Sequence, residues 1–204
     1  MSRQIQESFG ESVIEAFREF AKADLDDAET LEANLFAHIG EPVLRRNLAE
    51  TLYGARWIYK LGLALLVKNE EQLAHVRTQI VDYSSVCEGV LSAMVLHGLQ
   101  SNHLAGQKHR YKDIHRLRNR LNWNVTDVLT KISRQPFYWL IEVALEENIV
   151  SNPLSGRLHT MRTSRNTVHL RARNQRAFIG TSRALFQTVI DTCQETSHWV
   201  AVNP

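Results

Sequence analysis

The sequence contains little of what disulfide-rich, many-turned or membrane-spanning proteins require. Its 204 residues include two Cys, nine Gly and four Pro. So few turn-forming residues argue against a β-sandwich and favour long helices. Both cysteines lie inside segments of apolar periodicity, which predicts buried thiols in a reducing compartment. The longest apolar run, residues 61–67, is far shorter than the roughly 20 residues of a membrane-spanning helix. Because residues 1–20 also show no secretory signal, we expect a cytoplasmic protein without membrane association.

Charge is distributed unevenly along a chain whose formal net charge is only +2. Acids dominate the first fifty residues, but none occurs between Asn148 and Ile190. That acid-free stretch contains Arg157, Arg162, Arg165, Arg171, Arg173, Arg176 and Arg183. The asymmetry predicts an anionic partner for the C-terminal half, either a nucleic acid or an acidic protein surface such as the N-terminus of a neighbouring subunit.

Apolar residues recur at spacings of three and four through most of the chain, and no strand-like alternation bounded by turns appears. We therefore predict an all-α protein, an up-and-down bundle of four core helices joined by short connections. The predicted core helices are 43–68, 70–99, 153–173 and 176–200, with a further short apolar helix at 137–145. The segment 43–68 is apolar over most of its circumference in its second half, which favours a central position.

The chain divides at Gly40-Glu41-Pro42, where one helical unit ends and Pro42 suits the first turn of the next. We predict that residues 1–40 form an acidic helical segment, with a break near 24–27, that packs on the core. Residues 41–204 then form the bundle itself.

Four polar side chains gather on one stretch of the predicted helix at residues 157–174. At 100° per residue, Arg162 and His169 lie about 20° apart around the helix, and Arg165 and His169 about 40° apart. Asn166 follows Arg165 directly. The same helix carries an apolar stripe, which consists of Leu154, Leu158, Met161 and Val168. A cation at the edge of such a stripe is costly to desolvate without a partner, so this position asks for a functional explanation.

This stretch, Leu158-His-Thr-Met-Arg162-Thr-Ser-Arg165-Asn166-Thr-Val-His169-Leu, resembles the signature of the HEPN superfamily. In that family an Arg, often followed by a polar residue, is separated from a His by four to six intervening residues on a helix of a small bundle. Two upstream segments, Ser84-Ser-Val-Cys-Glu-Gly-Val-Leu and Phe137-Tyr-Trp-Leu-Ile-Glu-Val-Ala-Leu-Glu-Glu, resemble the family's earlier helices. The likeness covers residues 50–200.

The sequence departs from the family pattern at the arginine. Arg165-Asn166 is the natural Arg–polar pair, but only three residues separate Arg165 from His169. Arg162 has six intervening residues and satisfies the family spacing, but Thr163 follows it. Both arginines remain candidates.

The resemblance implies a metal-independent endoribonuclease without a cofactor, whose site forms where two subunits of a homodimer meet. His169 would take the proton of a ribose 2′-hydroxyl or protonate the leaving oxygen, because imidazole titrates near neutrality. Arg162 or Arg165 would stabilise the phosphorane, and Asn166 would orient the phosphate or the imidazole. The expected product is a 2′,3′-cyclic phosphate. Such enzymes act as toxins or anti-phage effectors, so an antitoxin or another protein partner is also expected.

Supporting residues follow from the same interpretation. Glu88 either pairs with Arg162 or Arg165 across the bundle and fixes the guanidinium, or faces solvent. Four further arginines of this region are expected to bind RNA: Arg157, Arg171, Arg173 and Arg176.

The alternative is a non-catalytic helical scaffold that uses the arginine-rich face to bind nucleotide, RNA or an acidic protein. An Arg and a His four residues apart on a helix often form only a hydrogen-bonding seam or a subunit contact. A zinc site is not expected, because His97, His103 and His109 lack Cys or carboxylates at ligand spacing. The four tryptophans have the spacing of core residues rather than of base-stacking ones.

Overall fold

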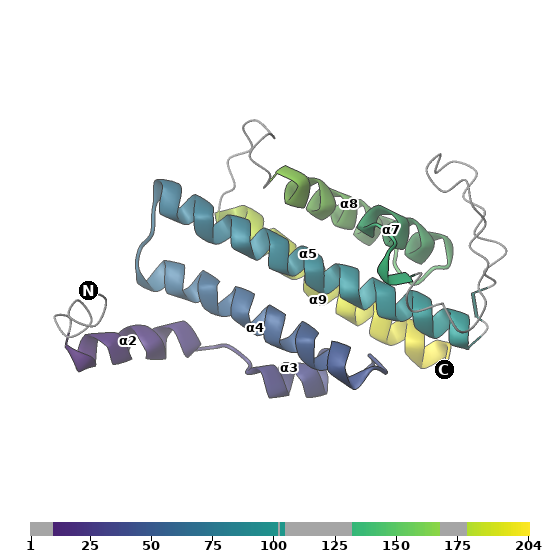
Figure 1. Ribbon diagram of the computed structural model, residues 1–204, viewed down its shortest axis with the longest axis horizontal. Coiled ribbons are helices and arrows are strands. Elements are labelled where there is room, and N and C mark those ends of the chain that lie inside the picture. The colour runs from purple at the N-terminus through teal and green to yellow at the C-terminus, as the bar shows by residue number, and fades with distance from the viewer. Residues whose placement is uncertain (1–9, 102, 105–131, 168–178) are drawn as a thin grey trace.

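The computed structural model of the protein describes residues 10–101, 103–104, 132–167 and 179–204. The helices defined in these ranges are α2 (Glu11–Lys22), α3 (Ala28–Asn34), α4 (Pro42–Ala64), α5 (Asn69–Gln100), α7 (Phe137–Glu146), α8 (Asn152–Thr167) and α9 (Ile179–Val202) (Figure 1). No strand occurs among the described residues, which confirms the predicted all-α fold. None of their helices is both long and apolar enough to cross a membrane.

The direction of the chain alternates along α4, α5, α8 and α9, as an up-and-down bundle requires (Figure 1). Helices α5 and α9 consequently run in the same direction. Side-chain pairs along their interface demonstrate the parallel register, since Gln79 pairs with Ser182 and, further along both helices, Cys87 pairs with Thr192. Helices α5 and α9 are direct neighbours, and α5 also packs against α4, α7 and α8.

The centre of the bundle is α5 rather than the predicted 43–68 helix. The helix predicted at 43–68 is α4, and it packs between α5 on one side and the α2–α3 layer on the other (Figure 1). Helix α7, which the prediction of four core helices left out, also belongs to the core. Its buried residues are Phe137, Trp139, Leu140, Ile141, Val143 and Ala144. Their apolar character extends around most of the helix, so α7 contributes to the interior on several sides.

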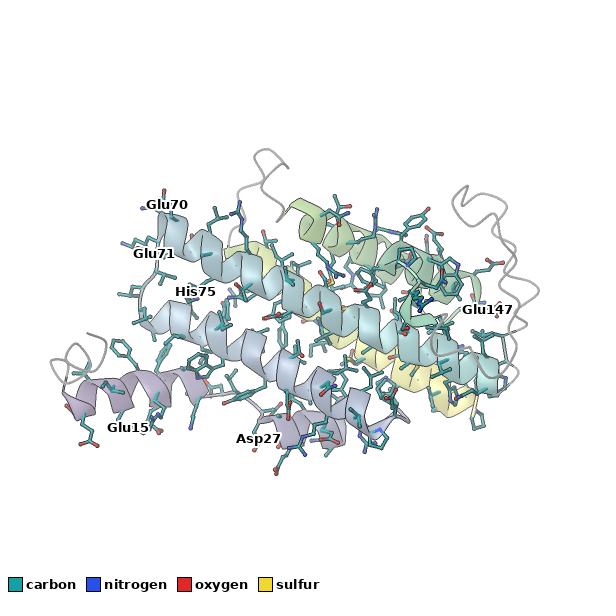
Figure 2. The ribbon with its side chains drawn as sticks, viewed as in Figure 1. Glu15, Asp27, Glu70, Glu71, His75 and Glu147 are labelled. Carbon is teal, nitrogen blue, oxygen red and sulfur yellow. The ribbon has the colours of Figure 1, made fainter. Side chains whose placement is uncertain are left out.

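Local signals explain where the helices begin and end. Asp24, with φ of 59°, interrupts the N-terminal pattern, and the Asp27 carboxylate accepts a hydrogen bond from the Thr30 amide at 2.7 Å to begin α3 (Figure 2). This is the predicted break. Pro42 occupies the first turn of α4 as expected. Helix α4 ends at Ala64 rather than at 68, because Leu66 adopts a φ of 51° and is 77% exposed.

The N-terminal helices contribute to the same core as the bundle. Both α2 and α3 pack on α4, and Phe36 and Ile39, which follow α3, are completely buried. The described helices of this segment, α2 and α3, thus lie against the bundle through α4. Whether residues 1–40 and 41–204 are separate domains stays a prediction.

Candidate functional site

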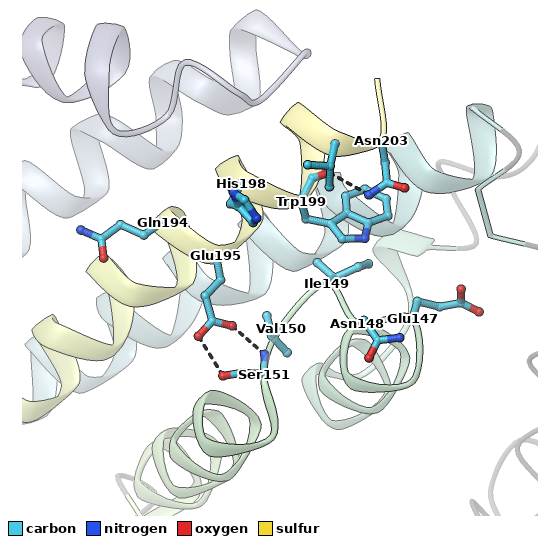
Figure 3. Close-up of a pocket in the computed structure, with 11 residues that line it drawn as sticks. Glu147, Asn148, Ile149, Val150, Ser151, Gln194, Glu195, His198, Trp199 and Asn203 are labelled. Carbon is cyan, nitrogen blue, oxygen red and sulfur yellow. Dashed lines mark hydrogen bonds between the residues drawn. The ribbon is translucent and has the colours of Figure 1, made fainter.

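Helix α8 is anchored at its N-terminus by contacts that define its orientation. The Ser151 hydroxyl accepts a hydrogen bond from the Leu154 amide at 3.4 Å, so Ser151 caps the helix. Glu195 of α9 accepts from the Ser151 amide at 2.6 Å and from its hydroxyl at 2.8 Å (Figure 3). Three members of the predicted apolar stripe, Leu154, Leu158 and Met161, are completely buried. The arginines one turn further along are thereby placed at the edge of the core.

Arg165 forms an ion pair with Glu88 of α5, in which Nη1 donates to Oε2. The Arg165 side chain is 35% exposed and the Glu88 side chain 29%. Of the two alternatives left open for Glu88, an ion pair across the bundle or a solvent-facing position, the structure has the ion pair, and the partner is Arg165. A charge-assisted hydrogen bond of this kind restricts the guanidinium to one position and neutralises its charge. Asn166, the next residue, is exposed.

Arg162 has a different environment, although it lies only three residues before Arg165. Its Nε is buried and has no hydrogen-bond partner. Within the described ranges its guanidinium forms no ion pair, and its Cζ lies 5.1 Å from the centroid of the Tyr138 ring of α7. The cation is therefore held by an aromatic face, whereas its hydrogen-bond donors have no acceptor on any described residue.

Beside Arg162, a carboxylate–imidazole pair joins α7 to α8. His159 Nε2 lies 3.1 Å from Glu142 Oε1, and the His159 and Tyr138 rings are 5.3 Å apart between centroids. Partial burial lowers the pKa of His159; Glu142 counteracts this effect and the Arg162 cation adds to it. The negative charge of Glu142 is the main cause that raises the pKa of the Tyr138 hydroxyl.

Sequence reasoning did not identify Tyr138, Glu142 and His159 as members of this cluster. One signal was present, because Tyr138 and Glu142 are four residues apart and His159 and Arg162 three, so each pair shares one helix face. What the sequence does not contain is the pairing of α7 with α8, which brings the two faces together.

Several predicted site residues lie outside the described residues. These are His169, Arg171, Arg173 and Arg176. The distance from His169 to either arginine is therefore not part of the structure, and the assigned roles stay predictions. Arg157 is described, and it forms an ion pair with Asp191 of α9. Its charge is thus already balanced within the chain.

An open groove of about 680 Å³ lies at the N-terminal end of α8, away from Arg162 and Arg165 (Figure 3). Residues of the α7–α8 connection, including Ser151, and of α9, including Glu195, His198 and Trp199, line it. Arg162 follows Ser151 by eleven positions along α8, which corresponds to about 16 Å at 1.5 Å per residue. None of Arg162, His159, Tyr138 and Glu142 lines the groove. The groove is consequently distinct from the cluster around Arg162.

The chemistry of thiols and metals finds no support in the described part of the chain. Burial raises the pKa of Cys87 to about 12 and also raises that of Cys193, so neither thiol ionises near neutral pH. Within the same ranges no three His, Cys, Asp or Glu residues gather as a metal site would need. On the face of α7 and α8, by contrast, titratable side chains of two helices contact one another.

No match was found when the chain was compared with models of protein families, with curated proteins and with solved structures.

Proposed function

We propose that this protein is a metal-independent endoribonuclease of HEPN type, with a toxin or anti-phage role and an active site formed across a homodimer. The observation that carries the proposal is the state of Arg162 on α8. It is a partly buried guanidinium whose Nε has no partner and whose donors meet no acceptor among the described residues. Such a group is unfavourable in the free protein and becomes favourable when a phosphate occupies the site.

Arg162 is the better candidate for the functional arginine. It precedes His169 by six intervening residues, the spacing that the HEPN resemblance requires. Arg165 is engaged by Glu88, and a guanidinium already neutralised by a carboxylate contributes less to a developing phosphorane charge. We assign Arg165 to the framework of the site and Asn166, which is exposed, to orientation of the phosphate.

The reaction requires only proton transfer and charge stabilisation. His169 removes the proton of a ribose 2′-hydroxyl, the 2′-oxygen attacks the adjacent phosphorus, and the bond from phosphorus to the 5′-oxygen breaks. The leaving 5′-oxygen takes up a proton, so the products are a 2′,3′-cyclic phosphate and a 5′-hydroxyl. Arg162 stabilises the additional negative charge of the phosphorane by a forked contact.

The test is cleavage of RNA by the purified protein in EDTA. We expect the wild type to cleave and to leave 2′,3′-cyclic phosphate ends, and His169→Ala and Arg162→Gln to lose at least about a hundredfold in rate. Arg46→Gln is a matched control, because Arg46 is an exposed arginine of α4 that pairs with Glu50. Equal activity in the wild type and His169→Ala would refute the proposal.

A second candidate, a non-catalytic scaffold for RNA or an acidic protein, is favoured by a different observation. Two arginines of α8, Arg157 and Arg165, are paired with acids of the same chain, as structural arginines often are. For a scaffold, we expect salt-sensitive RNA binding without cleavage, and no effect of His169→Ala on that binding.

A further inference from the structure

The outer face of the α7–α8 pair carries four polar side chains that the proposed reaction does not fully use. Tyr138 and Glu142 come from α7, and His159 and Arg162 from α8. Each touches at least one of the others: Glu142 pairs with His159, the His159 ring lies beside Tyr138, and the Arg162 guanidinium lies over the Tyr138 ring. They form one connected group, which we call the Tyr138 cluster.

The contacts within the Tyr138 cluster leave the hydrogen-bond donors of Arg162 without an acceptor among the described residues. Glu142, the only carboxylate of the cluster, pairs with His159, with 3.1 Å between Glu142 Oε1 and His159 Nε2. The Arg162 Cζ lies over the Tyr138 ring, 5.1 Å from its centroid, and an aromatic ring does not replace the acceptors that the N–H donors of a guanidinium require. Arg162 therefore has an aromatic neighbour but no acceptor for its donors among the described residues, and its Nε is withdrawn from water.

We propose that the Tyr138 cluster binds a phosphodiester group of single-stranded RNA, with Arg162 as the anchor and His159 as a second contact. A forked guanidinium matches two phosphate oxygens, and an aromatic ring beside an arginine is typical of proteins that bind single strands. Arg157 and Arg165 are paired with Asp191 and Glu88, so Arg162 is the arginine of α8 that forms no ion pair with a described residue and can bind an anion. In this arrangement Glu142 is a positioning residue that accepts from His159 Nε2 and orients the ring. The second ring nitrogen, Nδ1, donates to the phosphate when the imidazole is protonated, a form that the negative charge of the ligand favours.

The choice of RNA rests on the function proposed above, but binding at the cluster does not require cleavage. A single-stranded oligodeoxythymidine separates the two, because it has the phosphodiesters of RNA and lacks the 2′-hydroxyl nucleophile. Its binding to the full-length protein is measured by fluorescence anisotropy at low, constant salt, and inorganic phosphate serves as a competitor.

We expect Arg162→Gln to weaken oligodeoxythymidine binding by about tenfold or more, in line with the loss of charge-assisted hydrogen bonds. His159→Gln should weaken binding a few-fold at about pH 6, where the bound phosphate favours a protonated imidazole, and less at about pH 8. Arg162→Lys, which keeps the charge without the fork, should fall between the wild type and Arg162→Gln. Arg46→Gln removes the same charge from α4, a helix that does not pack on α7 or α8, and should bind like the wild type. If Arg162→Gln and Arg46→Gln weaken binding equally, the attraction is nonspecific and the inference is wrong.

The two proposals fail in different ways. Binding that depends on Arg162 in a protein that does not cleave RNA would support the cluster and refute the nuclease. Cleavage by the wild type, together with unchanged oligodeoxythymidine binding by folded Arg162→Gln and Arg162→Lys, would refute the cluster and leave the nuclease standing. Circular dichroism of each variant establishes that it is folded.

Discussion

At the scale of single residues, two arginines one helical turn apart have opposite relations to the fold. Arg165 completes an ion pair with Glu88, whereas Arg162 lies against an aromatic ring with its Nε buried and unsatisfied. An ion pair of this partial exposure stabilises the fold modestly, but an unsatisfied buried donor opposes folding. Functional groups are often kept in such unfavourable states because the ligand completes them.

This contrast predicts different effects of two substitutions on stability. Glu88→Gln should lower the free energy of unfolding by about 1 kcal/mol, because it leaves the Arg165 charge without its counterion. Arg162→Met should leave stability unchanged or raise it slightly, because it removes an unsatisfied donor and keeps the apolar stem. Urea unfolding followed by circular dichroism measures both. A loss for Arg162→Met as large as that for Glu88→Gln would indicate a structural role for Arg162.

A second residue-scale prediction concerns His38, whose Nε2 lies 2.9 Å from the Thr196 hydroxyl of α9. Burial lowers the pKa of His38 to about 4, below the ordinary value of 6.5. Between these values the unfolded state binds more protons than the folded state, so stability falls as the pH is lowered from about 6.5 towards 4. We expect a loss of about 1 to 2 kcal/mol between pH 7.5 and 5, allowing for the partial exposure of the ring.

The variant His38→Gln isolates this contribution, since an amide can still bond to Thr196 but does not titrate. Urea unfolding of both proteins at pH 7.5 and 5 gives the comparison. If the wild type and His38→Gln lose equal stability between pH 7.5 and 5, His38 is not the group that causes the loss.

At the scale of elements, close approach of helices places different demands on the glycines. Gly98 of α5 lies where a Cβ would be 2.5 Å from Leu104 Cγ and 3.1 Å from Trp199 Cη2. Gly54 of α4 has no atom within 4 Å of the corresponding position. The first glycine permits α9 to pack closely on α5, and the second has no such role.

We therefore expect opposite signs for the same change in two helices. Gly98→Ala should destabilise by about 1 to 3 kcal/mol through overpacking, in spite of the higher helix propensity of alanine. Gly54→Ala should stabilise by about 0.5 to 1 kcal/mol, because it restricts the unfolded chain without a clash. Thermal and urea unfolding would test the pair, and stabilisation by Gly98→Ala would contradict the packing described here.

At the scale of the whole molecule, the N-terminal helices serve as an outer layer on α4. Deletion of residues 1–40 should lower the free energy of unfolding by at least about 3 kcal/mol, because it removes the buried side chains Phe36 and Ile39 and uncovers the α4 face they contact. Urea unfolding of the shortened chain measures the change. Unaltered stability would mean that residues 41–204 form an independent domain.

The fold was predictable to the level of class and helix order. Apolar spacing located each described helix, since a 3.6-residue period follows directly from burial of one face. The ends were less accurate at α4, where the apolar pattern continues to Leu66 but a left-handed residue ends the helix. The central position of α5 was not predictable from its own pattern, because it depends on how many neighbours pack around it.

The candidate site was predictable only in part. Arg162, Arg165, Asn166 and His169 follow from local spacing along one helix, and Glu88 was one of two open alternatives. The contacts of Arg162 with α7 were not predictable, since the sequence does not show that the face of α7 with Tyr138 and Glu142 packs against α8. Side chains that meet across helices have no fixed separation in sequence.

Periodicity and charge in the sequence by themselves determined an all-α chain with an arginine-rich helix near its C-terminus, because helix formation and face selection are local. The tertiary structure decided which arginine is paired and which is not. Packing of α8 on α5 brought Arg165 to Glu88, and packing of α8 on α7 brought Arg162 to Tyr138 beside a carboxylate already held by His159. The physical reason is that the state of a charge depends on the atoms around it, and those atoms come from other helices.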